Sequence, residues 1–211
     1  LLPYLRHKAQ NPSAICQKWI PMSRRIEVVA PNPAWPEEYQ AIKARIATID
    51  APFLRIDHIG STAVPELAAK DVIDVQITVA ELASERVSAA LPELGYLSRV
   101  GITHDLLTGL DSSSSELAKR FCVAMLNQRA AHIHIREQGR LNQVYPLLFR
   151  DFLRANPTVR DAYAEVKIQL AARFTEDVDA YYAIKDPYMD TVYFAAQLWA
   201  EKTGWEVPAP E

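Results

Sequence analysis

The sequence predicts an α+β fold, in which a β-sheet with flanking helices is followed by a C-terminal helical segment. Two periodicities carry this prediction. Apolar and polar residues alternate along 72–79, the period of a half-buried strand, and apolar residues recur every three or four positions after Trp35, the period of an amphipathic helix. A third observation is the change after Gly139, beyond which the pattern is helical.

The first elements surround a glycine-containing turn. A short strand is expected at 26–29, ended by a cluster of prolines, and a helix begins at Trp35. The strand expected at 53–59 leads into the turn Gly60-Ser61-Thr62, and a short helical segment is expected at 64–70. The alternating strand at 72–79 follows it.

The middle of the sequence alternates helix, loop and strand. Residues 84–94 have a helical pattern that ends at Gly95, a residue common at helix ends. Residues 106–116 hold a run of four serines and are expected to form a mobile loop. Strands are expected at 120–126 and 132–136, and the short polar connection between them predicts an antiparallel hairpin.

Three regions are expected along the chain. Residues 1–25 form an N-terminal extension or linker, residues 26–140 the α+β core, and residues 141–205 a helical region that packs on the core. The helices of this last region are predicted at 142–154, 157–174 and 177–201, with Pro187 breaking or kinking the last one.

The start of the chain is unusual because its first residue is Leu1. Either the start is trimmed or the sequence is a piece of a longer protein, and Met22 opens a more plausible domain start. The first residues lack the apolar core and cleavage site of a secretory signal.

Composition excludes several classes of protein. A net charge of −3 over 211 residues gives no global field that attracts nucleic acid. No stretch approaches the roughly 20 apolar residues of a membrane span. Cys16 and Cys122 are the only cysteines, which argues against a structural zinc site and favours a reducing cytoplasm, although a bridge between them stays open.

The turn after the second strand is a candidate anion-binding site. Gly60 permits a tight turn and close backbone approach. If a helix begins after it, the free amides of Ser61, Thr62 and Ala63 point outward and favour an anion. The alternative is that Ser61 or Thr62 merely caps the helix. His58 contacts a phosphate beside this turn or, as readily, is a core histidine.

Two pairs of polar residues share sheet faces. Asp74 and Gln76 are two apart on one strand, and His132 and His134 are two apart on another. If both strands belong to one sheet, the four side chains line one wall beside the Gly60-Ser61 turn. Because polar groups are costly to bury without partners, this wall predicts a wet, ligand-binding cleft.

Several motifs resemble the GrpB family. The run HIGSTAVPELAAKDVIDVQITV (58–79) is similar to the family signature, from which it departs at Glu66, usually glycine, and at Asp71, usually proline. Further matches are AHIHI (131–135), LLFRDFLRANP (147–157), AYAEVK (162–167) and YYAIKDPYM (181–189). The motifs occur in the expected order, so the resemblance covers about 26–199.

The resemblance implies a nucleotidyltransferase-like fold with a mixed sheet, and a site for a nucleotide or other phosphorylated small molecule. In active members of that superfamily, carboxylates hold Mg²⁺ and a Gly-Ser turn binds phosphates. Carried over, Asp74, His132 and His134 are the catalytic candidates. The candidate phosphate or nucleotide ligands are His58, Gly60, Ser61, Thr62, Lys70, Gln76 and Lys167.

The metal and the reaction are less defined. Gln76 occupies the position of the second carboxylate and a histidine that of the third, so a standard pair of Mg²⁺ ions is poorly supported. Asp74 and His134 are the candidate ligands of a divalent metal, either Mg²⁺ or Mn²⁺ or a softer ion such as Zn²⁺ or Fe²⁺. The chain is expected to transfer a nucleotidyl group or to be a degenerate nucleotide-binding or accessory domain, as in fusions with dephospho-CoA kinase.

Overall fold

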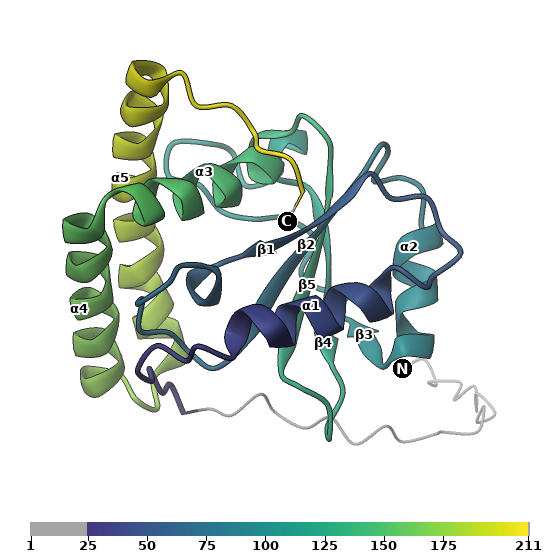
Figure 1. Ribbon diagram of the computed structural model, residues 1–211, viewed down its shortest axis with the longest axis horizontal. Helices are drawn as coiled ribbons and strands as arrows, with labels where there is room; N and C mark the ends of the chain where they lie inside the picture. Colours follow the sequence, from purple (N-terminus) through teal and green to yellow (C-terminus); the bar gives the residue numbers. More distant parts are fainter. Residues whose placement is uncertain (1–24, 211) are drawn as a thin grey trace, which may run out of the picture.

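The computed structural model describes residues 25–210, which form a five-stranded mixed sheet and five α-helices (Figure 1). This confirms the predicted α+β class. The strands are β1 (Arg55–Ile59), β2 (Ile73–Val79), β3 (Tyr96–Ser98), β4 (Lys119–Ala124) and β5 (Ala131–Glu137). The helices are α1 (Trp35–Ile46), α2 (Arg86–Ala90), α3 (Leu141–Ala155), α4 (Pro157–Arg173) and α5 (Val178–Thr203).

The two strands that carry the polar pairs are neighbours at the centre of the sheet. The strand order is β1-β2-β5-β4-β3, with β2 and β5 parallel and the other pairs antiparallel. Asp74 lies opposite His132, and Gln76 lies opposite His134. Since directly paired residues point to the same side of a sheet, all four side chains share one face. The hairpin predicted between β4 and β5 is confirmed by their antiparallel pairing.

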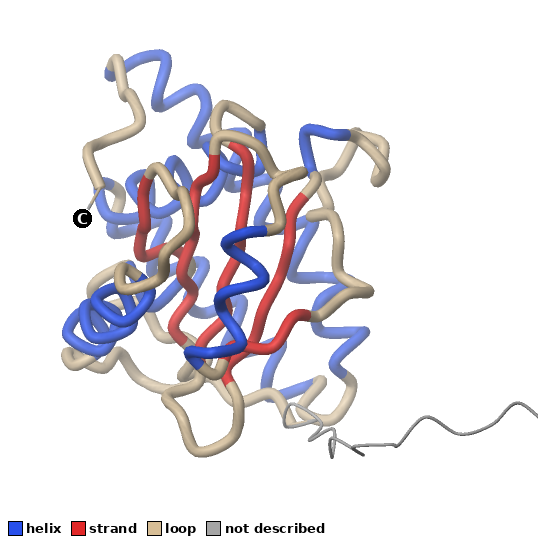
Figure 2. The backbone as a smooth tube through the Cα atoms, turned by 90° about the vertical axis from the view of Figure 1, so that its right-hand side faces the viewer, coloured by secondary structure: helices blue, strands red, loops and turns tan. Residues whose placement is uncertain are grey.

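The opposite face of the sheet holds the main hydrophobic core. The alternating apolar residues of β2 and β5 pack against α1, which crosses the sheet (Figures 1 and 2). On α1 the residues that face the sheet recur with the helical period. They are Trp35, Tyr39, Ile42 and Ile46, each at most 3% exposed. The sequence periodicity therefore identified this interface.

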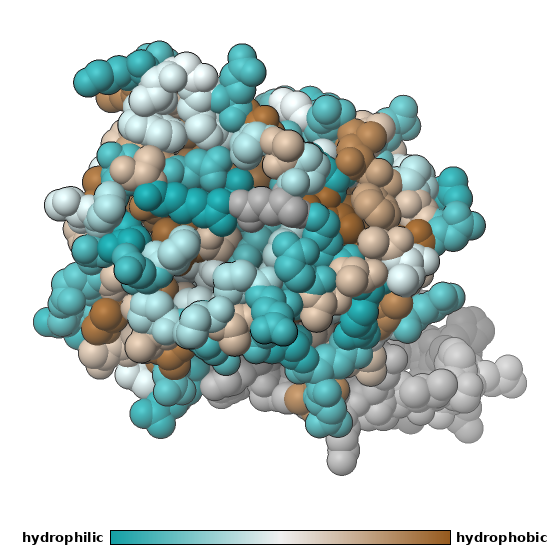
Figure 3. Space-filling model, viewed as in Figure 1, coloured by the Kyte–Doolittle hydropathy of each residue, from teal (hydrophilic) through white to brown (hydrophobic). Residues whose placement is uncertain are grey.

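The C-terminal helices form a second core beside the sheet. Helices α3, α4 and α5 gather at one end of the molecule (Figure 1), where their apolar residues pack together and against Val64 and Leu67 from the β1–β2 connection. Helix α3 also contacts β1 and β5. This packing brings α4 and α5 close to the Gly60-Ser61 turn. The surface of the molecule on the side seen in Figure 1 is mostly hydrophilic (Figure 3).

Two predicted elements are absent. Residues 26–29 form only an isolated bridge, Val29 with Ala69, because no longer partner strand runs beside them. Residues 64–70 are not helical, since Val64 precedes Pro65 and adopts an extended conformation with φ −105° and ψ 115°. A residue before proline is disfavoured in the α region.

Other elements differ in detail from the prediction. The helix expected at 84–94 divides into α2 and a 3₁₀ segment at Leu91–Leu94, because Pro92 cannot donate to an α-helical ladder. It ends, as expected, at Gly95 with a φ of 80°. Pro187 does not break α5, which continues through it. The short edge strand β3 was not predicted.

Some expectations concern residues outside this region. The predicted extension lies outside residues 25–210 apart from Arg25, as do Cys16 and Met22. Cys122 is a buried thiol whose burial raises its pKa to about 11. Between residues 25 and 210, no helix combines the length and apolar character needed to cross a membrane.

Candidate functional site

The candidate site is built around three side chains of the central strands. Asp74 from β2 lies 3.1 Å from His132 Nδ1 and 3.5 Å from His134 Nε2, measured from its Oδ1 atom. The side chains are 27%, 15% and 14% exposed, respectively, so all three reach solvent. Burial opposes ionisation of Asp74, but the hydrogen bonds from His132 and His134 outweigh it and hold the pKa of this carboxyl below its usual range.

His134 is held in place by a basic network on its other side. Arg136, two residues along β5, approaches Nδ1 of His134 at 3.3 Å and forms two hydrogen bonds with Asp105. Burial, together with the charge of Arg136, lowers the pKa of His134 to about 4, against the opposing effect of Asp74. His134 is therefore neutral at neutral pH. Because a guanidinium can only donate, Nδ1 is the acceptor and Nε2 carries the proton that faces Asp74.

The Gly60-Ser61 turn packs directly against Asp74. Gly60 has a φ of 71°, and a Cβ atom at this position would lie 2.5 Å from Oδ2 of Asp74. Both observations require glycine. The turn leads into a single 3₁₀ turn, Ser61–Ala63, rather than the longer helix considered from the sequence. The amide of Ala63 is bonded to the Gly60 carbonyl, so it does not point outward.

Ser61 is bonded to a buried lysine of α4. Lys167 is 2% exposed, and its Nζ lies 2.8 Å from Ser61 Oγ and also contacts the Ala68 carbonyl. The ring of Tyr163, one helical turn earlier, lies 4.6 Å from Nζ. Burial and the positive charges of Lys185 and Lys70 lower the pKa of Lys167 to about 7, with Asp74 opposing them.

Two further lysines complete what is here called the lysine cluster, Lys70, Lys167 and Lys185. Lys70 donates a hydrogen bond to the hydroxyl of Tyr182, and Lys185 lies 5.5 Å from the centre of the same ring. Nζ of Lys185 lies 3.5 Å from Oδ1 of Asp186 and 2.7 Å from Sδ of Met189. Three lysines beside two carboxylates, Asp74 and Asp186, make this corner of the site locally basic in a chain of net charge −3.

His58 and Thr62 are not brought to this site. His58 pairs with Val75, so its side chain points to the apolar face, where it stacks on Tyr39 with ring centres 4.5 Å apart. Its Nε2 atom is 3.0 Å from the Thr62 hydroxyl. Both residues are under 5% exposed. The structure therefore places them in the core.

Gln76 lies on the same face of the sheet as Asp74, but its side chain is buried. It is fully buried, its Oε1 accepts a hydrogen bond of 2.7 Å from Arg136, and its Nε2 donates to the Gln143 carbonyl. With both ends bonded to the protein, this side chain positions Arg136 and α3. The structure does not present it to a ligand.

Three polar residues near the site were not singled out from the sequence. They are Lys185 on α5, Arg136 on β5 and Asp105 in a loop. Arg136 had a signal, because it is two residues from His134 and therefore on the same face. Lys185 lies in the motif YYAIKDPYM, but no local pattern connects it to Lys167 on another helix. Asp105 comes from a loop and had no signal.

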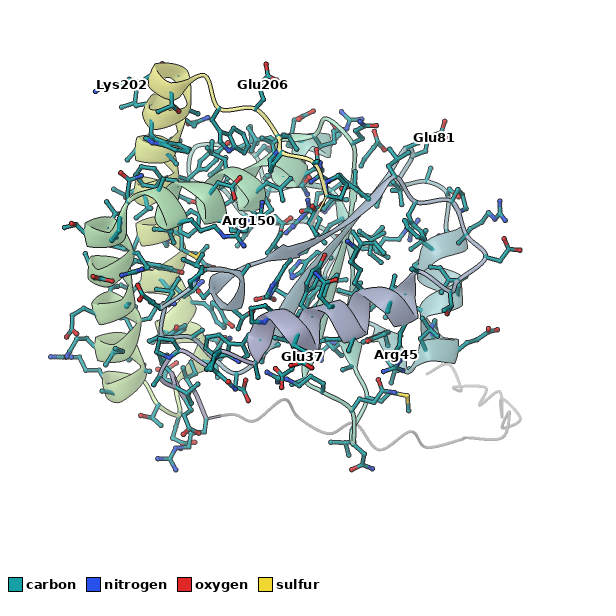
Figure 4. The ribbon with its side chains drawn as sticks, in the orientation of Figure 1. Glu37, Arg45, Glu81, Arg150, Lys202 and Glu206 are labelled. Carbon is teal, nitrogen blue, oxygen red and sulfur yellow. The ribbon has the colours of Figure 1, made fainter. Side chains whose placement is uncertain are left out.

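Arg150 and Asp151 form an ion pair on α3, with 2.8 Å between Nε and Oδ1. Arg150 lies between α3 and β1 (Figure 4) and donates to the backbone carbonyl of His58. It is 1% exposed. Its contacts therefore fix α3 on the sheet.

The polar wall lies apart from two hollows on the described surface. Two surface hollows are lined by residues away from it, one by 25–28 with part of α4, and the other by residues between 52 and 84 that do not include Asp74. The three central side chains lie at a partly exposed surface.

The donor set suits some metals better than others. One ligand atom from each of Asp74, His132 and His134 lies within 4.8 Å of the others. One carboxylate and two imidazoles do not fit Mg²⁺, which prefers oxygen ligands. They are the donors of a single borderline ion such as Zn²⁺, Mn²⁺ or Fe²⁺. Arg136 opposes such an ion, since it holds the His134 tautomer in which Nε2 is protonated.

The mixed sheet and the polar site define the class of protein, an α+β domain with a Gly-Ser turn facing a central aspartate and two histidines. Residues 25–194 match the model of the family described as GrpB protein. The chain belongs to the GrpB family.

Relatives and a solved structure agree with this assignment. The chain is 37% identical to a dephospho-CoA kinase of Mycolicibacterium paratuberculosis over 86% of this chain and 48% of that protein. It is 31% identical to the UPF0157 protein YqkA of Bacillus subtilis over 83% of this chain and 48% of that one. The chain thus spans about half the length of these relatives. The crystal structure of the conserved protein GrpB from Enterococcus faecalis matches with a TM-score of 0.67 and 29% identity, over 85% of this chain and 100% of that chain.

Proposed function

We propose that this chain binds a nucleotide or another phosphorylated small molecule at the exposed face formed by Asp74, His132, His134 and Ser61. The observation that carries the proposal is the lysine cluster beside the Gly60-Ser61 turn. Burying or crowding lysines is unfavourable unless negative charge compensates them. A phosphate group bound by Lys70 and Lys185, beside Lys167, supplies that charge.

The favoured activity is transfer of a nucleotidyl group. Asp74 is ionised and lies against the turn that holds Ser61, so it is available to orient a substrate hydroxyl or hold a cation. A bound borderline metal ion would polarise the phosphoryl oxygen, with Asp74 and His132 as its ligands and His134 after a change of tautomer.

A specific observation favours a second candidate, a nucleotide-binding accessory domain without turnover. Both ends of the Gln76 side chain are hydrogen-bonded, to Arg136 and to the Gln143 carbonyl. Asp74 is the one carboxylate in the group that it forms with His132 and His134. About half of each dephospho-CoA kinase relative lies outside the matched region. An accessory role beside another catalytic domain is consistent with both facts.

The test uses ATP and inorganic triphosphate as probes, with unfolding temperature and calorimetry as readouts. Both should raise the unfolding temperature of the wild type. Lys70→Met and Lys185→Met should each weaken binding by about 10-fold or more, the value of one charged hydrogen bond. Lys202→Met, at the distant end of α5 (Figure 4), is the matched control and should bind like the wild type.

Two results decide between the candidates. Equal binding by wild type, Lys70→Met and Lys185→Met would remove the proposed site. If binding is lost as expected, turnover of ATP that disappears in Asp74→Asn supports transfer, whereas binding without turnover supports the accessory role. Zn²⁺ should stabilise the protein more than Mn²⁺, and both should stabilise it more than Mg²⁺. Asp74→Asn should abolish the effect.

A further inference from the structure

The contact between Ser61 and Lys167 has a chemical meaning beyond phosphate binding. The two reactive atoms, Oγ and Nζ, are 2.8 Å apart. The ring of Tyr163 lies over Nζ, whose distance to the ring centre is 4.6 Å. A serine beside a buried lysine and a tyrosine is an arrangement that can activate the hydroxyl.

We propose that Ser61 is a nucleophile and Lys167 its general base. This inference rests on the proposed function in that the substrate carries a phosphoryl group. Oγ of Ser61 attacks the phosphorus of a phosphoric anhydride, the O–P bond forms, and the bond to the leaving phosphate breaks with its electron pair on that oxygen. The hydroxyl proton passes to Nζ of Lys167. An acceptor hydroxyl or water then takes the group from Ser61.

The turn geometry supports a nucleophile held at a fixed position. Ser61 follows β1 through Gly60, whose φ of 71° and ψ of −170° allow an abrupt change of direction. Contact with Asp74 leaves no room for a side chain at residue 60. A reactive serine placed on a sharp turn after a strand is presented with little freedom to move.

The surroundings of Lys167 support its role as a base. The charged groups that act on it are Lys70 before β2, Lys185 on α5 and Asp74 on β2. Asp186 on α5 and Tyr182 act on Tyr163, whose ring lies 4.6 Å from Nζ. Burial and the two lysines favour the neutral form of Lys167, so the amine is available near pH 7 to accept a proton. Lys70 and Lys185 remain to stabilise the leaving phosphate. The positive charge on Lys167 appears only when the serine ester forms.

The experiment uses a fluorophosphonate, which needs no knowledge of the natural substrate. Attack by Ser61 forms the O–P bond and releases fluoride, and the protein gains the mass of the phosphonyl group. Intact mass and peptide mapping should locate the adduct on Ser61. The rate should rise as the pH rises through about 7. Ser61→Ala should abolish labelling, whereas Ser84→Ala, which removes an exposed serine, should label like the wild type.

A substitution that keeps the positive charge but removes the basicity tests the role of Lys167 as a base. Arginine does not release its proton, so Lys167→Arg should be labelled at least about 100-fold more slowly than the wild type. Lys167→Met provides a second variant that also lacks the base, and circular dichroism confirms that each folds. Equal labelling rates in the wild type and in a folded Lys167 variant would overturn the inference.

The outcomes also separate this inference from the proposed function. ATP binding without any labelling of Ser61 overturns the nucleophile and leaves the phosphate site intact. Labelling of Ser61 in a protein that binds neither ATP nor triphosphate overturns the phosphate site instead.

Discussion

The two faces of one sheet differ in almost every physical respect. On the face covered by α1, the residues of β2 are Ile73, Val75, Ile77 and Val79, all at most 3% exposed. On the other face, the same strand presents Asp74, Gln76 and Thr78, and β5 presents two histidines and an arginine. The apolar face stabilises the fold by burying surface. Burying polar and charged side chains on the other face lowers that stability, but it fixes their orientation, which a functional site requires.

The comparison is tested most strongly on the apolar face. Ile133→Ala should lower the free energy of unfolding by about 3 kcal/mol, because Ile133 is fully buried and the substitution leaves a cavity. Urea unfolding measures the loss. Val123→Ala, half-buried on the polar face of the neighbouring strand, should cost about 1 kcal/mol or less. Similar losses at both positions would mean that the two faces contribute alike.

The next effect concerns the network under the polar face. Arg136→Met leaves Gln76 Oε1 and Asp105 without their guanidinium partner, and should cost about 2–3 kcal/mol because buried polar groups lose their hydrogen bonds. The control is Arg120→Met on β4, whose side chain is 31% exposed and pairs with Glu85 at the surface. It should cost less than about 1 kcal/mol. If Arg136→Met is as stable as its control, the network does not support the fold.

The pH dependence of stability should distinguish the faces. The pKa of His134 is about 4 in the folded protein against an ordinary value of 6.5, so the unfolded chain binds more protons between these values. Stability should therefore fall by about 2 kcal/mol as the pH falls from 6.5 to 4. This loss of stability is absent above pH 7. The lowered carboxyl pKa values of Asp74 and Asp105 act at lower pH.

His134→Asn removes this titration. Unfolding measured at several pH values should show a flatter profile between 4 and 6.5 for the variant than for the wild type, while Ile133→Ala should lower the profile without changing its slope there. Parallel profiles for wild type and His134→Asn would show that His134 does not titrate as the geometry indicates.

The smallest expected effect lies outside both faces, in the connection between β1 and β2. Glu66 has a φ of 63°, a conformation that glycine adopts without strain, and its side chain is 75% exposed. Glu66→Gly should raise stability by about 0.5–1 kcal/mol, partly offset by loss of the surface ion pair with Arg160. Glu66→Ala is the control, since it loses the ion pair but keeps the strain. A stabilised alanine variant would contradict the explanation.

Much of the fold followed from local pattern. Period-2 alternation identified β2, and β5 was predicted to within a residue at each end. The helical period identified the buried face of α1. The failures were local conflicts. Proline at position 65 prevented a helix, and 26–29 found one bridging partner rather than a strand. Pro187, by contrast, was accommodated within α5 because α5 packs against α3 and α4.

The sequence by itself determined the family, the strands and the sharing of a face by Asp74, His132 and His134, because side chains alternate strictly along a strand. Only the tertiary structure decided that His58 points into the core and that Gln76 is hydrogen-bonded to Arg136. It also decided that Lys167 is hydrogen-bonded to Ser61, with Lys70 and Lys185 close by. These contacts join separate elements. Their geometry depends on how helices pack against the sheet, which no local periodicity encodes.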